Sequence, residues 1–295
     1  MITIRVPATT ANLGLGFDCL GMALNCYARF SFEKTAQGLH ITGSDPEFLN
    51  QDNLVYQAFL AALKQHGVQP QGLLLHIDSD IPPARGLGSS AACVAGGIQG
   101  ANELYQLGMS SQDVFELACA LEGHPDNAAP AVFGGLQVSM MEGGRPYRLP
   151  SPLHPAWQVL ALIPDFSLKT AAARAALPAL VSLKDACYNL SHTAFLLKAL
   201  ENGEPTHLRL ACQDRLHQDA RFALIPGGAA LKTLAEDMGA AACWLSGAGP
   251  ALMCLYQDIS FKARLRPLIA QDYPQFTITP LALCGMGAAV ERTPT

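Results

Sequence analysis

Hydrophobic and polar positions recur along most of the 295-residue chain with the periods of strands and helices. Period-two alternation and short apolar runs predict strands at residues 2–6, 24–33, 38–42, 73–77, 134–141, 157–163, 241–245, 251–256 and 276–284. Apolar residues at helical spacing predict helices at 53–66, 91–102, 110–121, 170–177, 184–201, 204–219, 228–238 and 260–271. The last helix, hairpin, helix and strand are typical of an antiparallel sheet covered by helices on one face, which indicates an α+β fold.

A turn-rich patch divides this pattern near its middle. Glu142–Pro146 is charged and rich in Gly and Pro, and three more prolines follow it at Pro150, Pro152 and Pro155. A chain of this length can form two domains of roughly 150 residues with a cleft between them. We therefore expect one domain at residues 1–150 and a second at 151–295.

Composition excludes several classes of function. Half of the residues are hydrophobic, 15% are charged and the net charge is −5, without a cluster of Lys and Arg, which argues against a nucleic-acid partner. No apolar run is long enough to span a membrane, and the alternating start at Met1–Val6 does not resemble a signal peptide. Nine scattered cysteines without a CxxC pair indicate reduced thiols, so we expect a cytoplasmic protein.

The run Ile81–Ala92 is the strongest local signal. Two prolines, two glycines and two serines lead directly into an uncharged helix of small residues. A glycine-rich loop at a helix amino terminus presents unpaired N–H groups and the positive end of the helix dipole, which suits a phosphate group. No GxxxxGK[ST] sequence occurs, so this is not the common P-loop. A tight turn capped by Ser89 is the alternative, but Ser-Ser-Ala-Ala after Pro-Pro favours phosphate binding.

Two further segments concentrate polar groups in apolar surroundings. Pro7–Asp18 joins two predicted strands and carries Asn12 and Asp18, which could equally belong to an ordinary turn. Glu122–Gly135 places four polar residues close to two prolines, and burying them requires partners or a ligand. We interpret the second segment as part of a binding site.

Isolated charges complete the set of candidates. Glu116 is the one charge inside an apolar helix body, which indicates either a surface position or a cation such as Mg²⁺. Arg174 and Arg221 could each bind a carboxylate bidentately, although either alone could be a solvated side chain. Leu245–Ala251 permits close backbone approach, as a hairpin turn also would.

Taken together, three segments resemble the motifs of the GHMP kinases in order and spacing: Pro7–Asp18, Pro82–Ala92 and Ser246–Pro250. Within this superfamily the Ala-Asn-Leu-Gly-Leu-Gly-Phe-Asp start and the His-Pro-Asp-Asn segment resemble the homoserine kinase branch, and the similarity covers essentially the whole chain. The resemblance implies two α+β domains with ATP and substrate in the cleft between them.

The resemblance also implies site residues. ATP would contact Asn53, where the adenine pocket begins, and the loop residues Pro83, Ala84, Arg85, Gly86, Leu87, Gly88, Ser89, Ser90 and Ala91, with Mg²⁺ on Ser90 and Glu116. L-Homoserine would contact Asn12, Asp18, His124, Asp126, Asn127, Thr170, Arg174 and Arg221. Asp18, Asn127 and Arg221 would be the catalytic residues, with Asp18 a candidate for orienting the hydroxyl. A homodimer is expected.

Two other functions remain open from the sequence. Another GHMP kinase could act on mevalonate or a methylerythritol derivative, although the two arginines and the absence of a basic residue in the first motif count against it. A non-catalytic ATP-binding sensor could share the fold, although the serines and Glu116 that bind metal in this interpretation are present.

Overall fold

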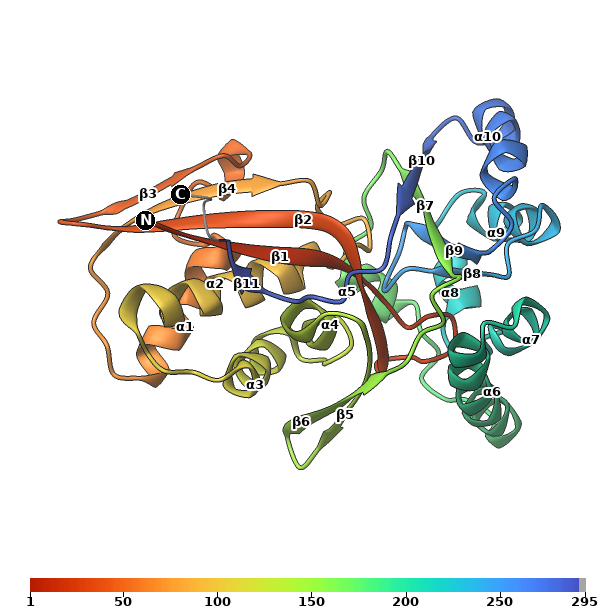
Figure 1. Cartoon of the computed structure of the whole chain (residues 1–295), viewed down its shortest axis with the longest axis horizontal. Coiled ribbons are helices and arrows are strands. Elements are labelled where there is room, and N and C mark those ends of the chain that lie inside the picture. Colours follow the sequence, from red (N-terminus) through yellow and green to blue (C-terminus); the bar gives the residue numbers. More distant parts are fainter. Residues whose placement is uncertain (292–295) are drawn as a thin grey trace.

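The computed structural model describes residues 1–291, which form two β-sheets with helices on their outer sides. Figure 1 shows the first sheet with α1–α4 beneath it at one end and the second sheet with α9 and α10 at the other. The first sheet has the order β11-β1-β2-β4-β3, and β5 pairs with both β2 and β6. The second has the order β10-β7-β9-β8. This arrangement confirms the α+β prediction.

Most elements lie where the hydrophobic pattern predicts them. The strands of the first sheet are β1 (Ile2–Ala11), β2 (Leu20–Thr35), β3 (Leu39–Thr42), β4 (Gly72–Ser79), β5 (Leu136–Glu142), β6 (Arg145–Ser151) and β11 (Ala289–Val290). Its helices are α1 (Leu54–Gln65), α2 (Ser89–Tyr105), α3 (Ser111–Glu122) and α4 (Ala128–Phe133), with a short 3₁₀ helix at Pro46–Phe48.

The first two strands are longer than predicted. β1 continues past Pro7, where the register with β2 shifts, because a proline is tolerated in a strand at such an irregularity. β2 begins at Leu20, so the loop between them shrinks to residues 12–19. β6 occupies part of the turn-rich patch, and its Pro146 and Pro150 lie on the edge strand of the sheet.

Small residues on α2 allow it to pack closely against its neighbours. A Cβ on Gly97 would meet the Val55 carbonyl of α1, and one on Gly96 or Gly100 would meet the rings of Phe30 or Phe32 in β2. The uncharged helix predicted after the glycine loop is therefore buried between α1 and the sheet. This packing fixes the position of its amino terminus.

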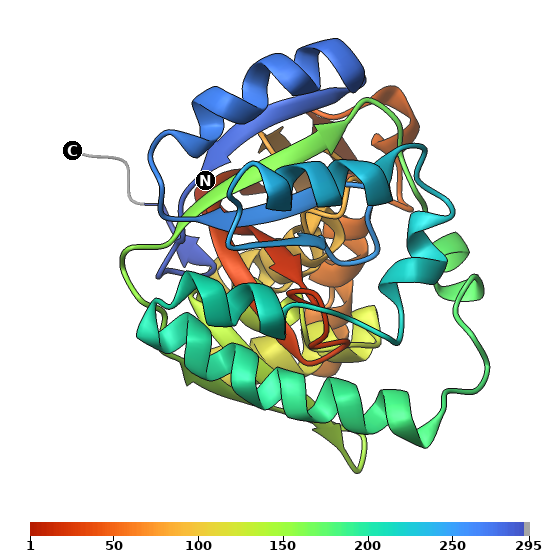
Figure 2. The ribbon, with the colours of Figure 1, turned by 90° about the vertical axis from the view of Figure 1, so that its right-hand side faces the viewer.

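The second sheet has two apolar faces. Its strands are β7 (Gln158–Pro164), β8 (Ala242–Leu245), β9 (Leu252–Tyr256) and β10 (Phe276–Leu281). Along β7, Leu160 and Leu162 join a core with α9 (Gly228–Asp237) and α10 (Phe261–Asp272), whereas Val159 and Ala161 join the core of the first sheet. Figure 2 shows α9 and α10 covering the outer face of this sheet.

The predicted helix at 204–219 is wrong in part. The structure contains α7 (Pro205–Ala211) and α8 (Gln218–Phe222), separated by a bend. At this bend the Asp214 carboxylate accepts hydrogen bonds from the N–H groups of His217 (2.8 Å) and Gln218 (2.7 Å), which starts a new helix. The remaining helices are α5 (Thr170–Ala175) and α6 (Leu183–Asn202). Among residues 1–291, no helix has the length and hydropathy needed to cross a membrane.

Candidate active site

A cavity of about 380 Å³ brings the three sequence motifs together. Gly86, Gly88, Ser89, Ser90 and Ala91 line one side of it. The rest of its lining includes Asn12, Asp18, Ala84, Glu122, His124, Asp126, Asn127, Thr170, Arg174, Arg221 and the loop Gly247–Gly249. The cavity therefore contains most of the candidate residues. They come from segments associated with both sheets.

The amino terminus of α2 opens into this cavity. The first N–H groups of a helix have no partner within the helix, and here they belong to Ser89, Ser90 and Ala91, all of which line the cavity. The N-cap is Gly88 (φ +69°), which has no side chain to occupy these donors. Four turns of α2 align their peptide dipoles behind the site, so the position favours an anion.

The third motif holds the glycine loop in place. Gly86 has φ +81°, and a Cβ there would collide with the Ser246 carbonyl. The Ser246 hydroxyl lies 2.5 Å from the Gly86 carbonyl and donates to it. Gly247 N–H in turn donates to the Ala11 carbonyl at the end of β1 (3.2 Å). The loop, the first motif and the third motif are thus joined through backbone contacts.

A second cavity of about 570 Å³ adjoins the first, and both are lined by Leu54, Ala84, Ser89 and Ser90. Pro83 and Asn53 also line it, together with apolar residues such as Phe30, Phe48 and Ile81. The Asn53 side chain is used within the protein, since its oxygen accepts from the N–H groups of Val55 and Tyr56 and its nitrogen donates to the Phe48 carbonyl. Asn53 thus shapes the cavity as the cap of α1.

Two residues of the loop point elsewhere. Arg85 donates to the carbonyls of Pro164 (3.1 Å) and Asp165 (2.7 Å) at the end of β7, which ties the loop to the second sheet. Leu87 is buried in the core of the first sheet. Neither residue lines either cavity, so their part in the site is to fix the loop backbone.

Glu116 does not reach the site, contrary to the sequence-based expectation. Its carboxylate accepts from Gln112 (3.1 Å) and lies 3.5 Å from Arg145, at a partly exposed position. Glu122, at the end of the same helix, instead accepts a hydrogen bond from the Ser90 hydroxyl at 2.5 Å. Burial raises the pKa of the Glu122 carboxyl, while the hydrogen bond from Ser90 and the nearby His124 oppose this shift.

The polar segment after Glu122 is internally paired. His124 Nδ1 lies 3.0 Å from an Asp126 carboxylate oxygen, and that hydrogen bond raises the pKa of His124. The same oxygen accepts from the Asn127 N–H (2.9 Å), and Asn127 accepts from the Thr9 hydroxyl (2.7 Å). The segment is therefore held rigidly against β1.

The loop after β1 brings Asn12 and Asp18 into the lining of the cavity. Asn12 and Asp18 both have positive φ (69° and 55°), a conformation that Asn and Asp tolerate better than most residues. The Asn12 oxygen accepts from the Asp18 N–H (3.0 Å), so Asn12 shapes the loop. The Asp18 carboxylate pairs with Arg174 through two hydrogen bonds of 2.9 and 3.2 Å.

Arg221 is the most unusual group in the cavity. It is almost completely buried, and its Nη1 donates to the Gly247 carbonyl (3.0 Å) and to His217 (3.2 Å). Its Nε is buried without a hydrogen-bond partner among the described residues. Burial and the nearby Arg174 lower the pKa of Arg221, so an anion at this position would relieve both effects.

Comparison with known proteins supports one family. Residues 53–135 match the model of the GHMP kinases N terminal domain. A homoserine kinase of Clostridium beijerinckii is 40% identical over 293 residues, which cover 98% of this chain and 98% of that protein. The chain belongs to the homoserine kinase family. The resemblance based on the three motifs is thereby confirmed.

Solved structures of the homoserine kinase family share the whole fold. A homoserine kinase of Cytophaga hutchinsonii aligns with a TM-score of 0.88 at 26% identity, covering 98% of this chain and 97% of that one. A Listeria monocytogenes protein assigned as a homoserine kinase aligns with a TM-score of 0.84 at 31% identity, covering 99% and 100%. The GHMP kinase fold predicted from the motifs is confirmed.

The sequence analysis gave no individual role to two residues of this homoserine kinase family member. Glu122 belongs to the segment interpreted as part of a binding site, but the metal was assigned to Glu116 instead. His217 lies in the predicted helix 204–219. Nothing in the pattern indicated that this helix breaks or that the buried His217 ring contacts Arg221.

Proposed function

We propose that this chain transfers the γ-phosphoryl group of ATP to the side-chain hydroxyl of L-homoserine and forms O-phospho-L-homoserine. The observation that carries the proposal is the cavity itself, which sets the free amino terminus of α2 opposite a buried arginine with an orphaned Nε. The amino terminus of α2 suits phosphate and the arginine suits a carboxylate, and both line the same cavity.

ATP would occupy both cavities. Its phosphates would receive hydrogen bonds from the N–H groups of Ser89, Ser90 and Ala91, and the neighbouring apolar cavity lined by Phe30, Phe48 and Pro83 would take the base. Membership of a kinase family supports the use of ATP.

Ser90 and Glu122 fit a magnesium ion. A hydroxyl and a carboxylate are hard oxygen ligands, and Mg²⁺ typically takes one or two such protein ligands together with water and phosphate oxygens. Bound there, Mg²⁺ would neutralise charge on the transferring phosphoryl group.

Arg221 and Arg174 would bind the substrate carboxylate. Arg221 offers its unpaired Nε, and Arg174 lies across the same cavity in a pair with Asp18. His124, Asp126, Asn127 and Thr170 line the remaining wall, where the amino and hydroxyl ends would lie. Phosphoryl transfer depends mainly on positioning and charge stabilisation, so Asp18 and Asn127 would act by orienting the hydroxyl.

The experiment is an ADP-release assay on the purified protein with ATP, Mg²⁺ and a panel of alcohols. L-Homoserine should support turnover far better than mevalonate, and chelation of Mg²⁺ should abolish it. Turnover of mevalonate at least as fast as L-homoserine would make the substrate assignment wrong.

Three broader expectations belong to the same proposal. We propose that residues 1–150 and 151–295 act as two domains, with β11 returning from the second to the sheet of the first. We also propose that the protein forms a homodimer and works in the cytoplasm. The nine free cysteines support a reducing compartment. Light scattering on the full chain tests the dimer, and a monomeric mass would exclude it.

A further inference from the structure

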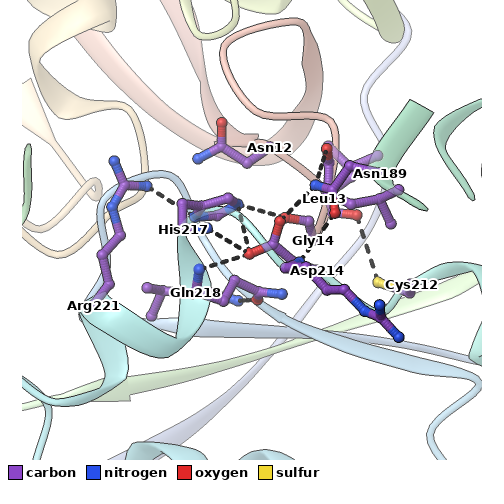
Figure 3. Close-up of polar contacts among 12 residues, drawn as sticks. Asn12, Leu13, Gly14, Asn189, Cys212, Asp214, His217, Gln218 and Arg221 are labelled. Carbon is purple, nitrogen blue, oxygen red and sulfur yellow. Dashed lines mark hydrogen bonds and ion pairs between the residues drawn. The ribbon is translucent and has the colours of Figure 1, made fainter. Parts of the chain in front are cut away.

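His217 contacts both Arg221 and the loop that carries Asn12 and Asp18. His217 is buried, its Nε2 lies 2.5 Å from the Gly14 carbonyl, and its Nδ1 lies 3.2 Å from Arg221 Nη1 (Figure 3). A carbonyl only accepts and a guanidinium only donates hydrogen bonds. The Nε2 atom must therefore carry the proton while Nδ1 accepts, which defines one tautomer of the neutral imidazole.

The ring has little freedom to turn. The Asp214 carboxylate accepts from the backbone N–H of His217 and also from the Asn189 side chain at 2.8 Å, as Figure 3 shows. The Phe17 ring packs against the imidazole with 4.9 Å between the ring centroids. Both nitrogens of His217 are consequently aimed at fixed partners.

This geometry determines which edge of Arg221 is available. Nη1 carries two hydrogens, and its two acceptors are the Gly247 carbonyl and His217 Nδ1. The Nε side carries neither contact. A guanidinium held in this way presents its Nε edge, which is one of the edges that can bind a carboxylate with two parallel hydrogen bonds.

The Nε2 atom of His217 connects this arginine to the first motif through the Gly14 carbonyl. Gly14 belongs to the loop between β1 and β2, and the same loop carries Asn12 and Asp18. Asn12 also donates to the Gly247 carbonyl (2.9 Å), the acceptor that Arg221 uses. His217 and Gly247 are thus two bridges between the arginine and the loop.

We propose that His217 is a positioning residue that turns the Nε edge of Arg221 toward the substrate carboxylate and holds the Asn12–Asp18 loop beside it. The proposal rests on the substrate role proposed for Arg221. It assigns to His217 a contribution to L-homoserine binding without contact with the substrate.

Protonation would oppose this arrangement. A proton on Nδ1 would face the N–H of Arg221, so donor would meet donor and two positive charges would lie together. The charged groups that face His217 are Asp214 and Arg221 from its own segment and Asp18 from the first-motif loop. Burial and Arg221 lower the pKa of His217, while the two aspartates oppose this shift. We expect homoserine binding to weaken only below the ordinary histidine value of 6.5.

Two substitutions separate the two hydrogen bonds. In His217→Gln the amide nitrogen can occupy the place of Nε2 and donate to Gly14, but Arg221 loses its acceptor. In His217→Asn the amide oxygen can occupy the place of Nδ1 and accept from Arg221, but Gly14 loses its donor. His207→Gln, at an exposed histidine on α7, is the matched control for the substitution itself.

The measurements are the KM values for L-homoserine and for ATP, together with kcat. His217→Gln should raise the homoserine KM by roughly 10-fold or more and leave the ATP KM unchanged, because a hydrogen bond to a charged group is lost. His217→Asn should also raise the homoserine KM, but by a factor several times smaller than in His217→Gln. His217→Gln added to Arg221→Ala should have little further effect, because both act through one contact. The rise in homoserine KM at low pH should be absent from His217→Asn.

Other results would overturn the proposal. Equal losses in the Asn and Gln variants, or effects of His217→Gln and Arg221→Ala that multiply, would mean that His217 serves stability alone. A normal homoserine KM in His217→Gln with an impaired Arg221→Ala would overturn the positioning role and leave the proposed function intact. A normal homoserine KM in Arg221→Ala would overturn both.

Discussion

The Ser90 hydroxyl donates to the Glu122 carboxylate across 2.5 Å and so connects the start of α2 to the end of α3. This contact lies at the open end of the helix dipole, beside the N–H groups that would receive phosphate. It makes Glu122 the carboxylate next to the proposed phosphate site, whereas Glu116 is a partly exposed member of a pair with Arg145.

Glu122→Gln should lower kcat by on the order of 10²-fold or more, because it removes a charge proposed to hold Mg²⁺ at the transferring phosphoryl group. Its effect on ATP affinity should be smaller, and raising Mg²⁺ should recover part of the loss. Steady-state kinetics with Glu116→Gln as the matched control check this. A larger loss in Glu116→Gln than in Glu122→Gln would reverse the assignment.

Gly86→Ala should raise the ATP KM at least 10-fold, on the order of 1.4 kcal/mol in binding, because a Cβ would meet the Ser246 carbonyl and push the loop off α2. Gly144→Ala is the control, since Gly144 has a similar positive φ (79°) but no atom within 4 Å of the added Cβ. Both variants carry the left-handed strain of about 1–2 kcal/mol. Equal ATP KM values in Gly86→Ala and Gly144→Ala would show that the collision with Ser246 has no effect on ATP binding.

The pair of His124 and Asp126 should make stability depend on pH. The hydrogen bond to Asp126 raises the pKa of His124 above 6.5, so the stabilising charged form is fully present below that value. Its contribution is lost as pH rises through the raised pKa. Urea unfolding at pH 6 and pH 9 should therefore show a larger difference between wild type and His124→Asn at pH 6. A larger difference at pH 9 would contradict the pairing.

Arg221→Ala should weaken the use of L-homoserine by about 10- to 150-fold, the equivalent of one charged hydrogen bond, with ATP affinity nearly unchanged. Arg174→Ala should act in the same direction. The corresponding amino alcohol, which lacks the carboxylate, provides the specific check. Wild type should discriminate strongly against it and Arg221→Ala much less; equal discrimination by wild type and both variants would place the arginines outside the carboxylate site.

The sequence predicted the fold and most of the cavity because local patterns determine them. The period of α2, the prolines before it and the glycines at its start are local features, and each agrees with the structure. Ser90, His124 and Arg221 come from segments that are distant in sequence, and the structure brings them to one cavity.

The sequence-based expectations differ from the structure where the packing of helices and strands, and not the local sequence, determines which side chains meet. Glu116 and Glu122 lie on one helix, and only the packing of α3 against α2 determines which carboxylate meets Ser90. At the break before α8 the Asp214 carboxylate accepts from the N–H groups of His217 and Gln218, and the helical pattern does not reveal these contacts. Arg85 was expected at the phosphates, but two carbonyls at the end of β7 attract its guanidinium away.

The most direct test of the proposed function is a competition in which L-homoserine and mevalonate share one reaction with ATP and Mg²⁺. Mass spectrometry and ³¹P NMR of the products would identify which hydroxyl receives the phosphoryl group. We predict O-phospho-L-homoserine as the dominant product, formed only with Mg²⁺ and formed much more slowly by Arg221→Ala. Phosphomevalonate as the main product, or no phosphorylated product while ATP still binds, would contradict the assignment.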